Sequence, residues 1–381
     1  MSKAKIVDEL QAFLEKLVVA DLFSGAVLIA LNGVPIFKKA YGLANKSFNV
    51  PNQIDTKFNL GSMNKMFTAV AIAQLAERGK LAFSDLISKH LPDYPRTVGD
   101  KVTIHHLLTH TSGMGDFFNE KFFFSSKDRF KTVEAFLPLF QDDPLSFEPG
   151  AQWQYSNAGF IVLGAIIEQV VGQSYFDYVR EHIYKSAVMP NTDAYELDQP
   201  IPNLAIGYTN MGDNFQPLLG SRRRSHLFML PVKGCPAAGG YSTVSDLLNF
   251  DIALRQHKLL SYKYTNIVLS GKVAFSDEIF AKYAYGFVDE RVNEFFDGRV
   301  KQKRITGHKG GIPGINAPRD MYLDDGYTVV VLSNYDPPAG QRVAAKLREL
   351  INYKQGTHPT RRETWRVTLI DTGDKSKELN I

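Results

Sequence analysis

A serine and a lysine stand three positions apart in Ser62-Met63-Asn64-Lys65, directly after Gly61 and before an apolar run. Side chains three positions apart on a helix share one face, so the amine can reach the hydroxyl. The positive end of the helix dipole disfavours an ammonium at the N-terminus, so we expect a lowered lysine pKa. A neutral lysine could then accept the serine proton and create an activated nucleophile.

This spacing is not specific by itself, because roughly one or two such matches arise by chance in a chain of this composition. Ser2-Lys3-Ala4-Lys5 is a second match, which we interpret as accidental because it lies in the first residues of the chain. Ser62 therefore needs partners from elsewhere in the sequence.

Tyr155-Ser156-Asn157 could supply two such partners. A tyrosine hydroxyl can relay a proton to a leaving group, and an asparagine amide can hold a substrate carbonyl and bridge to the lysine. The same spacing occurs at Tyr208-Thr209-Asn210 and Tyr264-Thr265-Asn266, and each of the three could be a turn sequence. Context favours the first, because the turn sequence 147–150 precedes it and an apolar helix follows Asn157.

The segment 307–314, Gly-His-Lys-Gly-Gly-Ile-Pro-Gly, is the third candidate and follows a β-rich run. Glycines at the end of a strand let a substrate backbone or an oxyanion approach closely, and the N–H after Gly310 could donate to it. The alternative interpretation is a glycine-rich turn between two strands.

The sequence does not indicate a metal site, a cofactor, a disulfide or an α/β-hydrolase. His105, His106 and His110 cluster in the sequence, but acyl transfer needs no metal, and we expect neither a metal site nor a cofactor. Cys235 is the only cysteine, so an internal disulfide is impossible, and a buried structural thiol is expected. An α/β-hydrolase is excluded because the chain has no G-x-S-x-G motif.

Composition narrows the partners. The net charge of +4, from 44 basic and 40 acidic residues among 381, is too balanced to indicate nucleic-acid binding. No stretch approaches the roughly 20 apolar residues of a membrane span, and the first residues lack the apolar core of a signal peptide. We therefore expect a cytoplasmic protein that acts on a small molecule, in an oligomeric state that the sequence does not define.

The elements that must position these residues follow from hydrophobic periodicity. Apolar residues at helical spacing over 6–18 predict an N-terminal helix. Two apolar runs, 26–31 and 35–41, flank Asn32-Gly33, which predicts a hairpin with a tight turn. The helix that carries Lys65 should run from 65 to 78, with Gly79 as its stop.

The middle of the chain, from about 62 to 256, is predicted to be mostly helical, with further helices over 161–171 and 245–255. Strands are expected again at the C-terminal end, over 283–289, 303–307, 320–323 and 327–333. Asp325-Gly326 should close the last hairpin. A final helix is predicted over 341–351.

This order predicts an α+β fold: an antiparallel sheet built from both ends of the chain, flanked by the N- and C-terminal helices, with a mostly helical region inserted. We expect a discontinuous sheet domain of residues 1–60 and 240–352 and a helical domain of residues 61–239. Residues 353–381 form a polar C-terminal extension of unknown role.

Taken together, the segments resemble the serine β-lactamase and penicillin-binding-protein superfamily over about residues 10 to 352. The branch they are most similar to contains class C β-lactamases, family VIII carboxylesterases and D-specific peptidases. Two further segments carry the resemblance, Leu-Leu-Thr-His-Thr-Ser-Gly at 107–113 and Ala-Gly-Gly-Tyr-Ser-Thr at 238–243. It implies a β-lactamase/transpeptidase-like fold.

The resemblance also implies roles. Ser62 would be the acylated nucleophile, Lys65 its general base, and Tyr155 a partner in proton transfer. The N–H groups of Ser62 and Gly311 would form the oxyanion hole. The groups that would bind the substrate are Asn157, His308, Lys309 and Gly310.

Lys309 departs from the family, in which many relatives carry at that position a hydroxyl that binds a substrate carboxylate. A lysine could pair with such a carboxylate or point away from the site. The departure argues against recognition of penicillin and of D-Ala-D-Ala.

The predicted function is therefore a serine hydrolase that forms an acyl-enzyme at Ser62, a carboxylesterase on small acyl esters with possible weak β-lactam hydrolysis. The alternative is a D-amino-acid-specific peptidase or amidase, or a penicillin-binding D,D-peptidase. A non-catalytic sensor domain is a third possibility, although such domains usually lose the lysine or the tyrosine.

Overall fold

A computed structural model describes residues 2–212, 216, 223–275, 280–296 and 299–352, and the predicted extension at 353–381 lies outside these ranges. Its centre is an eight-stranded sheet with the order β2-β1-β14-β13-β12-β11-β10-β9, in which all neighbours are antiparallel. The strands are β1 Gly25–Leu31, β2 Val34–Tyr41, β9 Val273–Ala274, β10 Ala281–Tyr283, β11 Val288–Phe296, β12 Arg299–Ile312, β13 Ile315–Tyr322 and β14 Tyr327–Ser333.

The two ends of the chain meet in the middle of this sheet. β1 pairs with β14 from Gly25↔Ser333 to Leu31↔Tyr327. The β1–β2 hairpin turns at Asn32 and Gly33, whose φ angles are +53° and +80°, as the Asn-Gly signal predicts. The predicted assembly of one sheet from both termini is confirmed.

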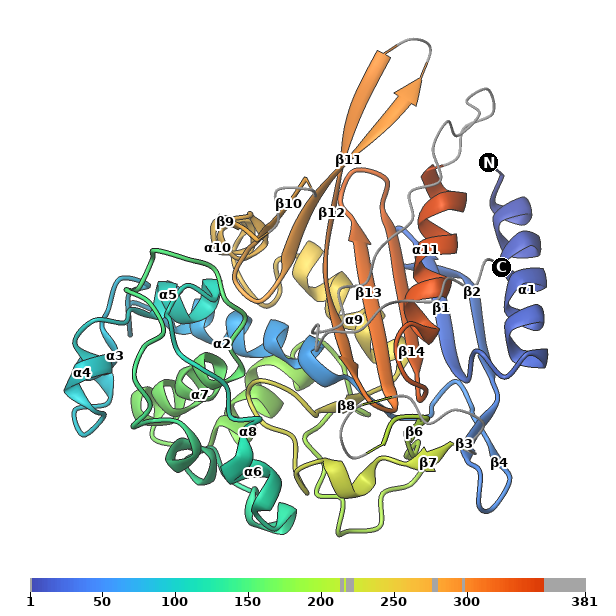
Figure 1. Cartoon of the computed structure of the whole chain (residues 1–381). Helices are drawn as coiled ribbons and strands as arrows, with labels where there is room; N and C mark the ends of the chain where they lie inside the picture. Colours follow the sequence, from blue (N-terminus) through green and yellow to red (C-terminus); the bar gives the residue numbers. More distant parts are fainter. Residues whose placement is uncertain (1, 213–215, 217–222, 276–279, 297–298, 353–381) are drawn as a thin grey trace.

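Two hydrophobic cores cover the two faces of the sheet. Val27 and Ile29 of β1 point to one face, where they pack with α1 (Lys3–Val19) and α11 (Ala339–Asn352). Ala26, Leu28 and Ala30 alternate to the other face and join the larger core formed with the inner helices. Figure 1 shows α1 and α11 on one side of the sheet and the helical lobe on the other.

The helical lobe surrounds α2, whose residues up to Ala76 are all buried. Its helices are α2 Lys65–Glu77, α3 Ile87–His90, α4 Arg96–Gly99, α5 Ile104–Thr109, α6 Glu120–Phe124, α7 Asn157–Val171 and α8 Tyr175–Val179. α9 (Val244–Arg255) packs on β1 and β14, and α10 (Tyr262–Leu269) packs on α2. The predicted α+β class and the predicted long helices are confirmed.

Short strands and single turns complete the fold. The short strands are β3 Leu43–Asn45, β4 Val50–Pro51, β5 Phe58–Asn59, β6 Tyr208–Thr209, β7 Arg224–Ser225 and β8 Tyr241–Ser242. The 3₁₀ and π turns are η1 Gly61–Asn64, η2 Lys127–Arg129, η3 Glu134–Leu139, η4 Arg180–Lys185 and η5 Leu227–Met229.

Three predicted strands differ from the structure. The predicted strand 320–323 is only the end of β13, which begins at Ile315. The predicted strand 283–289 is instead the end of β10, a turn and the start of β11, because Gly286 has a φ of +69°. The predicted strand 303–307 is much longer, since β12 continues through the glycine-rich segment to Ile312. His308, Lys309 and Gly310 therefore lie inside a strand, and the turn comes only at 313–314.

Within the described residues, no single helix is long and apolar enough to cross a membrane. α7 together with the helical segment Tyr175–Lys185 meets the criteria of length and composition as a pair, but the two are bent by 83°. The same residues contain no group of three or more His, Cys, Asp or Glu side chains that could hold a metal ion.

Candidate active site

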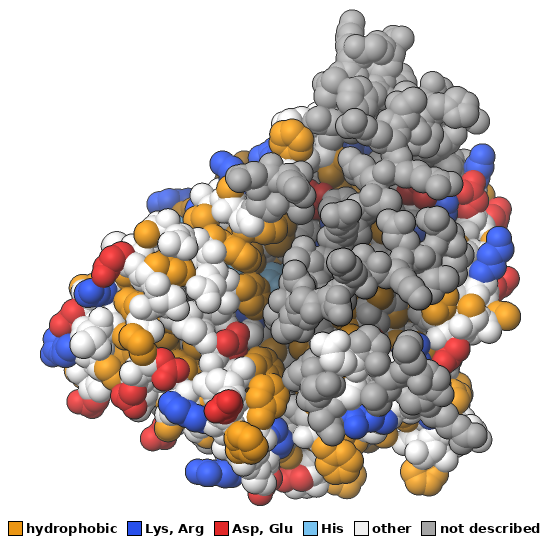
Figure 2. Space-filling view, in the orientation of Figure 1, with side chains coloured by type: hydrophobic (Ala, Val, Ile, Leu, Met, Phe, Trp, Pro, Cys, Tyr) orange, Lys and Arg blue, Asp and Glu red, His pale blue; other side chains and the backbone are white. Residues whose placement is uncertain are grey.

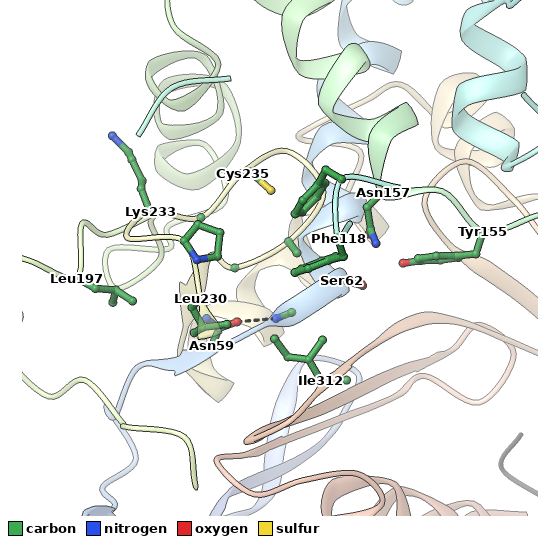
Figure 3. A pocket seen from close by; sticks show the side chains of 17 residues that line it. Asn59, Ser62, Phe118, Tyr155, Asn157, Leu197, Leu230, Lys233, Cys235 and Ile312 are labelled. Carbon is green, nitrogen blue, oxygen red and sulfur yellow. Dashed lines mark hydrogen bonds between the residues drawn. The ribbon is translucent and has the colours of Figure 1, made fainter. Parts of the chain in front are cut away.

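Ser62 lies in η1, the single turn that leads into α2. Two contacts fix the start of this turn: the Gly61 N–H donates to Asn59 Oδ1 at 2.8 Å, and the Leu60 N–H donates to the Gly240 carbonyl at 2.8 Å. Figure 3 shows the first of these beside Ser62. The serine side chain is only partly buried and is therefore open to a substrate.

Lys65 is fully buried, and its amine has three partners. Nζ donates to Ser62 Oγ at 3.4 Å, to Asn157 Oδ1 at 2.6 Å and to the Ala237 carbonyl at 2.8 Å. Burial, which disfavours the ammonium, lowers the pKa of Lys65 to about 7, although Asp116 and Cys235 act in the opposite direction. The lowered pKa expected from the sequence is present, with burial rather than the helix dipole as its largest cause.

Asn157 begins α7 and connects Lys65 to a residue that the sequence reasoning did not select. Its Nδ2 donates to Asp116 Oδ2 at 2.7 Å, while its Oδ1 accepts from Lys65. Asp116 follows the Thr-Ser-Gly of segment 107–113 by three positions. The sequence did contain a signal for Asp116, because it is an acidic residue in a glycine-containing loop directly after the motif at 107–113.

Tyr155 brings its hydroxyl to the same place. Tyr155 and Ser62 line the same pocket, and Lys65 Nζ lies 4.7 Å from the centre of the tyrosine ring. Burial raises the pKa of Tyr155 above its usual value, and the nearby Ser62 hydroxyl only partly offsets this effect. Tyr155 therefore stays a protonated donor near neutral pH.

The two other Y-x-N sequences lie elsewhere. The Tyr208 hydroxyl accepts from the Lys46 N–H at 2.6 Å, and the Tyr264 hydroxyl donates to the Ala76 carbonyl at 3.2 Å. Of the three tyrosines, only Tyr155 lines the pocket that holds Ser62.

His308 is neutral and both of its ring nitrogens are engaged. Nδ1 donates to the Lys309 carbonyl at 2.8 Å, so Nε2 must accept from the Tyr283 hydroxyl at 3.0 Å. Burial, reinforced by the charge of Lys65, lowers the pKa of His308 to about 3. His308 is therefore neither an acid nor a base near neutral pH, and it does not line the pocket around Ser62.

Lys309 points to the opposite face of the sheet, because successive side chains of a strand alternate. Its charged neighbours are Arg348 of α11, Asp320 of β13 and Glu290 of β11. The side chain is exposed and does not line the pocket around Ser62. The structure thus brings Ser62, Lys65, Tyr155, Asn157 and Gly311 together and leaves the side chain of Lys309 apart.

Gly310 lets β12 pack directly against the serine turn. A Cβ atom on Gly310 would lie 1.8 Å from the Leu60 carbonyl oxygen. A Cβ on Gly61, whose φ is +50°, would lie 3.3 Å from the Gly311 nitrogen. The backbones of Ser62 and Gly311 therefore border one small space, as an oxyanion hole requires.

The pocket in front of Ser62 has a volume of about 170 Å³ and a mostly apolar lining. Its walls include Phe117 and Pro231. They also include Phe118, Leu230 and Ile312, which are labelled in Figure 3. Figure 2 shows hydrophobic side chains gathered on the side of the helical lobe that faces the sheet.

Cys235 also borders the pocket, and its thiol is buried. Burial raises the pKa of this thiol to about 11, so it stays protonated. The predicted buried structural thiol is confirmed.

A serine beside a buried lysine, in a turn packed against an antiparallel strand, defines a class of serine hydrolases. The chain belongs to the beta-lactamase family, because a sequence model of that family, described as Beta-lactamase, matches residues 10–353. The resemblance to the serine β-lactamase and penicillin-binding-protein superfamily is confirmed.

Individual relatives agree with this assignment. "Penicillin-binding protein 4*" of Bacillus subtilis (strain 168) is 31% identical over 333 residues, which cover 85% of this chain and 71% of the relative. The crystal structure of a penicillin-binding protein from Bacillus halodurans is 33% identical, with a TM-score of 0.76, and the match covers 88% of this chain and 98% of that one.

Two more distant structures share the fold. They are D-amino acid amidase from Ochrobactrum anthropi SV3, at 21% identity and a TM-score of 0.75, and the hydrolase EstCE1, at 21% identity and a TM-score of 0.74. The matches cover 91% and 92% of this chain and 99% of each of the others.

Proposed function

We propose that this serine hydrolase is a carboxylesterase that acts on small acyl esters through an acyl-enzyme at Ser62. The observation that carries the proposal is the buried Lys65, whose amine lies 3.4 Å from Ser62 Oγ and whose pKa is about 7. An amine with this pKa is partly neutral at physiological pH and can accept the serine proton.

The reaction proceeds in two acyl transfers. Lys65 Nζ takes the proton of Ser62 as Oγ attacks the ester carbonyl, and the N–H groups of Ser62 and Gly311 hold the resulting oxyanion. Tyr155 donates its proton to the departing alkoxide, and the proton held by Lys65 returns to the tyrosine. Water then attacks the acyl-enzyme with Lys65 again as the base. As the bond between the acyl group and Ser62 Oγ breaks, the proton held by Lys65 returns to Oγ and the carboxylic acid is released.

The pocket supports small, uncharged acyl groups. Its volume of about 170 Å³ is below the roughly 300–1,000 Å³ of pockets for drug-sized ligands. Its mostly apolar walls suit an alkyl or aryl acyl group better than a carboxylate, because an unpaired charge is costly to bury. Lys233, the basic side chain in the lining, is already paired with Glu196 at 3.0 Å.

A second candidate is a penicillin-binding D,D-peptidase, favoured by the names of the relatives at 31% and 33% identity. The placement of Lys309 away from the pocket favours the esterase, because the residue at that position would otherwise be the one to meet a substrate carboxylate.

The test is a substrate panel of p-nitrophenyl butyrate, nitrocefin and D-alanyl p-nitroanilide, combined with mass spectrometry after treatment with a fluorophosphonate. We expect ester turnover, a single adduct on Ser62, and a loss of at least about 10³-fold in Ser62→Ala. Ser2→Ala, in the accidental second match of the serine–lysine spacing, is the matched control and should keep full activity.

Anilide turnover without ester turnover would support a D-specific peptidase instead. A stable penicillin adduct on Ser62 without ester turnover would support the D,D-peptidase. Ester turnover that survives Ser62→Ala would rule out the mechanism.

A further inference from the structure

Asp116 lies in the loop between α5 and α6, and its carboxylate faces the start of α7. Oδ2 accepts from the Asn157 side-chain amide at 2.7 Å and from the Asn157 backbone N–H at 3.3 Å. Oδ1 accepts from the Phe118 N–H at 3.0 Å. Both oxygens are therefore occupied by groups that line the pocket around Ser62.

The loop that carries Asp116 is held in place independently of these bonds. Ser156 Oγ donates to the Gly115 carbonyl at 2.6 Å, and the Ser146 N–H donates to the Gly113 carbonyl at 2.8 Å. Gly113 has a φ of +75°, and a Cβ there would lie 2.4 Å from the Phe147 carbonyl oxygen. The carboxylate is thus presented from a fixed backbone.

The bond to Asp116 decides which way the Asn157 amide faces. A carboxylate accepts only, so Nδ2 must face Asp116 and Oδ1 must face Lys65, where it accepts at 2.6 Å. The reversed amide would set oxygen against oxygen and NH₂ against the lysine amine. Nδ2 carries two hydrogens, and the one that Asp116 does not use can serve the carbonyl of a substrate.

We propose that Asp116 is a positioning residue, which holds the Asn157 amide with its oxygen on Lys65 and one N–H toward the substrate. The proposal rests on acyl transfer at Ser62, and it adds a residue that acts through Asn157 without touching the reacting atoms. Asp116 has a second effect, because its negative charge favours the ammonium form of Lys65 and so raises the pKa of that amine.

Other groups that face Lys65 bear on this pKa and stay unchanged when Asp116 is replaced. Burial dominates, and the titratable neighbours besides Asp116 are Cys235, Tyr155, His110 and His308. The Cys235 thiol and the Tyr155 phenol are neutral near pH 7, and burial lowers the pKa of both histidines far enough to keep them neutral. Of these neighbours, Asp116 is therefore the one that carries a charge near pH 7, and replacing it removes that charge from the surroundings of Lys65.

The test compares Asp116→Ala, Asp116→Asn and the control Asp142→Asn, whose side chain is exposed. Each is measured for kcat, KM and the pH dependence of kcat on p-nitrophenyl butyrate. Asp116→Ala should lower kcat at the high-pH plateau on the order of 10²-fold, which is the usual effect when a group that orients the substrate is misplaced. Asp116→Asn keeps one acceptor but removes the charge, so the midpoint of its acid limb should fall by at least about 0.5 pH unit.

A double-mutant cycle with Asn157 distinguishes a positioning role of Asp116 from a merely structural one. In an Asn157→Ala background, adding Asp116→Ala should change the plateau kcat by no more than about twofold, because the group it positions is gone. Independent, multiplying losses would overturn the proposal. An Asp116→Asn enzyme with an unchanged kcat and an unchanged pH midpoint would also overturn the proposal. If Asp116→Ala does not fold, Asp116→Asn alone decides the test.

Failure of this proposal differs from failure of the proposed function. A wild-type enzyme that forms no fluorophosphonate adduct on Ser62 contradicts the acyl-enzyme itself. A labelled wild type with fully active Asp116 variants contradicts only the role of Asp116.

Discussion

At the residue scale, the serine, lysine, tyrosine and asparagine selected from the sequence meet in one place. Their types and their order along the chain were sufficient for that prediction. Asp116, the Ala237 carbonyl and Tyr283 were not selected, although they contact Asn157, Lys65 and His308. The contacts of the Ala237 carbonyl and of Tyr283 depend on how distant loops pack, whereas the position of Asp116 beside segment 107–113 was a local signal that could have been used.

The buried amine of Lys65 makes a prediction about pH. Because burial lowers its pKa to about 7, the neutral base is lost as the pH falls below that value, so kcat/KM should rise with pH through a midpoint near 7. Lys65→Ala should lower kcat by about 10²–10⁴-fold and lose this limb. The measurement is a pH–rate profile from pH 5 to 9 with p-nitrophenyl butyrate.

Lys5→Ala is the control, because Lys5 occupies the equivalent position in the accidental serine–lysine match and is exposed. A limb with the same midpoint in Lys65→Ala would mean that another group is the base.

At the element scale, long periodic helices and the Asn-Gly hairpin were predicted well, whereas the glycine-rich strands were not. β12 runs through Gly307, Gly310 and Gly311, residues that weaken any strand signal because they offer no side chain to pack. The structure explains two of them by close approach: a Cβ on Gly307 would lie 1.9 Å from the Arg319 carbonyl oxygen, and a Cβ on Gly310 would lie 1.8 Å from the Leu60 carbonyl oxygen. Such glycines report contacts between distant elements.

Gly310→Ala tests this reading of β12. The added methyl group would overlap the Leu60 carbonyl, so β12 and η1 must separate, and we expect kcat to fall on the order of 10²-fold because the oxyanion donors move apart. Gly99→Ala is the matched control, since a Cβ there meets its nearest neighbours only at 3.5 Å. Kinetics and thermal unfolding of both variants are the measurement, and a fully active Gly310→Ala would contradict the close approach.

At the scale of the whole molecule, the sheet separates two hydrophobic cores, one that contributes to stability alone and one that also borders the Ser62 pocket. The core on the α1–α11 face holds the two terminal helices against the sheet, and the Ser62 pocket lies on the other face. The sequence predicted the sheet and its flanking helices because alternating and helical periodicities are local signals. The division into a sheet domain and a helical domain remains a prediction.

Leu347→Ala should therefore separate stability from activity. Leu347 of α11 is fully buried, and its truncation should lower the free energy of unfolding by about 2–5 kcal/mol. The activity per folded molecule should not change, because the pocket is on the opposite face. Urea unfolding gives the first quantity, and fluorophosphonate titration of active sites normalises the second.

Val19→Ala is the control in the same layer, since Val19 is 90% exposed and its truncation should cost less than about 0.5 kcal/mol. Equal destabilisation of the two variants, or a lower activity per titrated site in Leu347→Ala, would contradict this division of duties.

The pairing of β1 with β14 also affects how the protein can fold during its synthesis on the ribosome. Gly25 cannot meet Ser333 until about 300 further residues have been synthesised, which takes roughly 15–60 s at rates of about 5–20 residues per second. During that time β1, an apolar strand buried in the finished sheet, has only β2 as a partner. Contacts this distant in sequence slow folding, so pairing with β2 is the only contact in the described sheet that can cover the apolar residues of β1 until β14 has been synthesised.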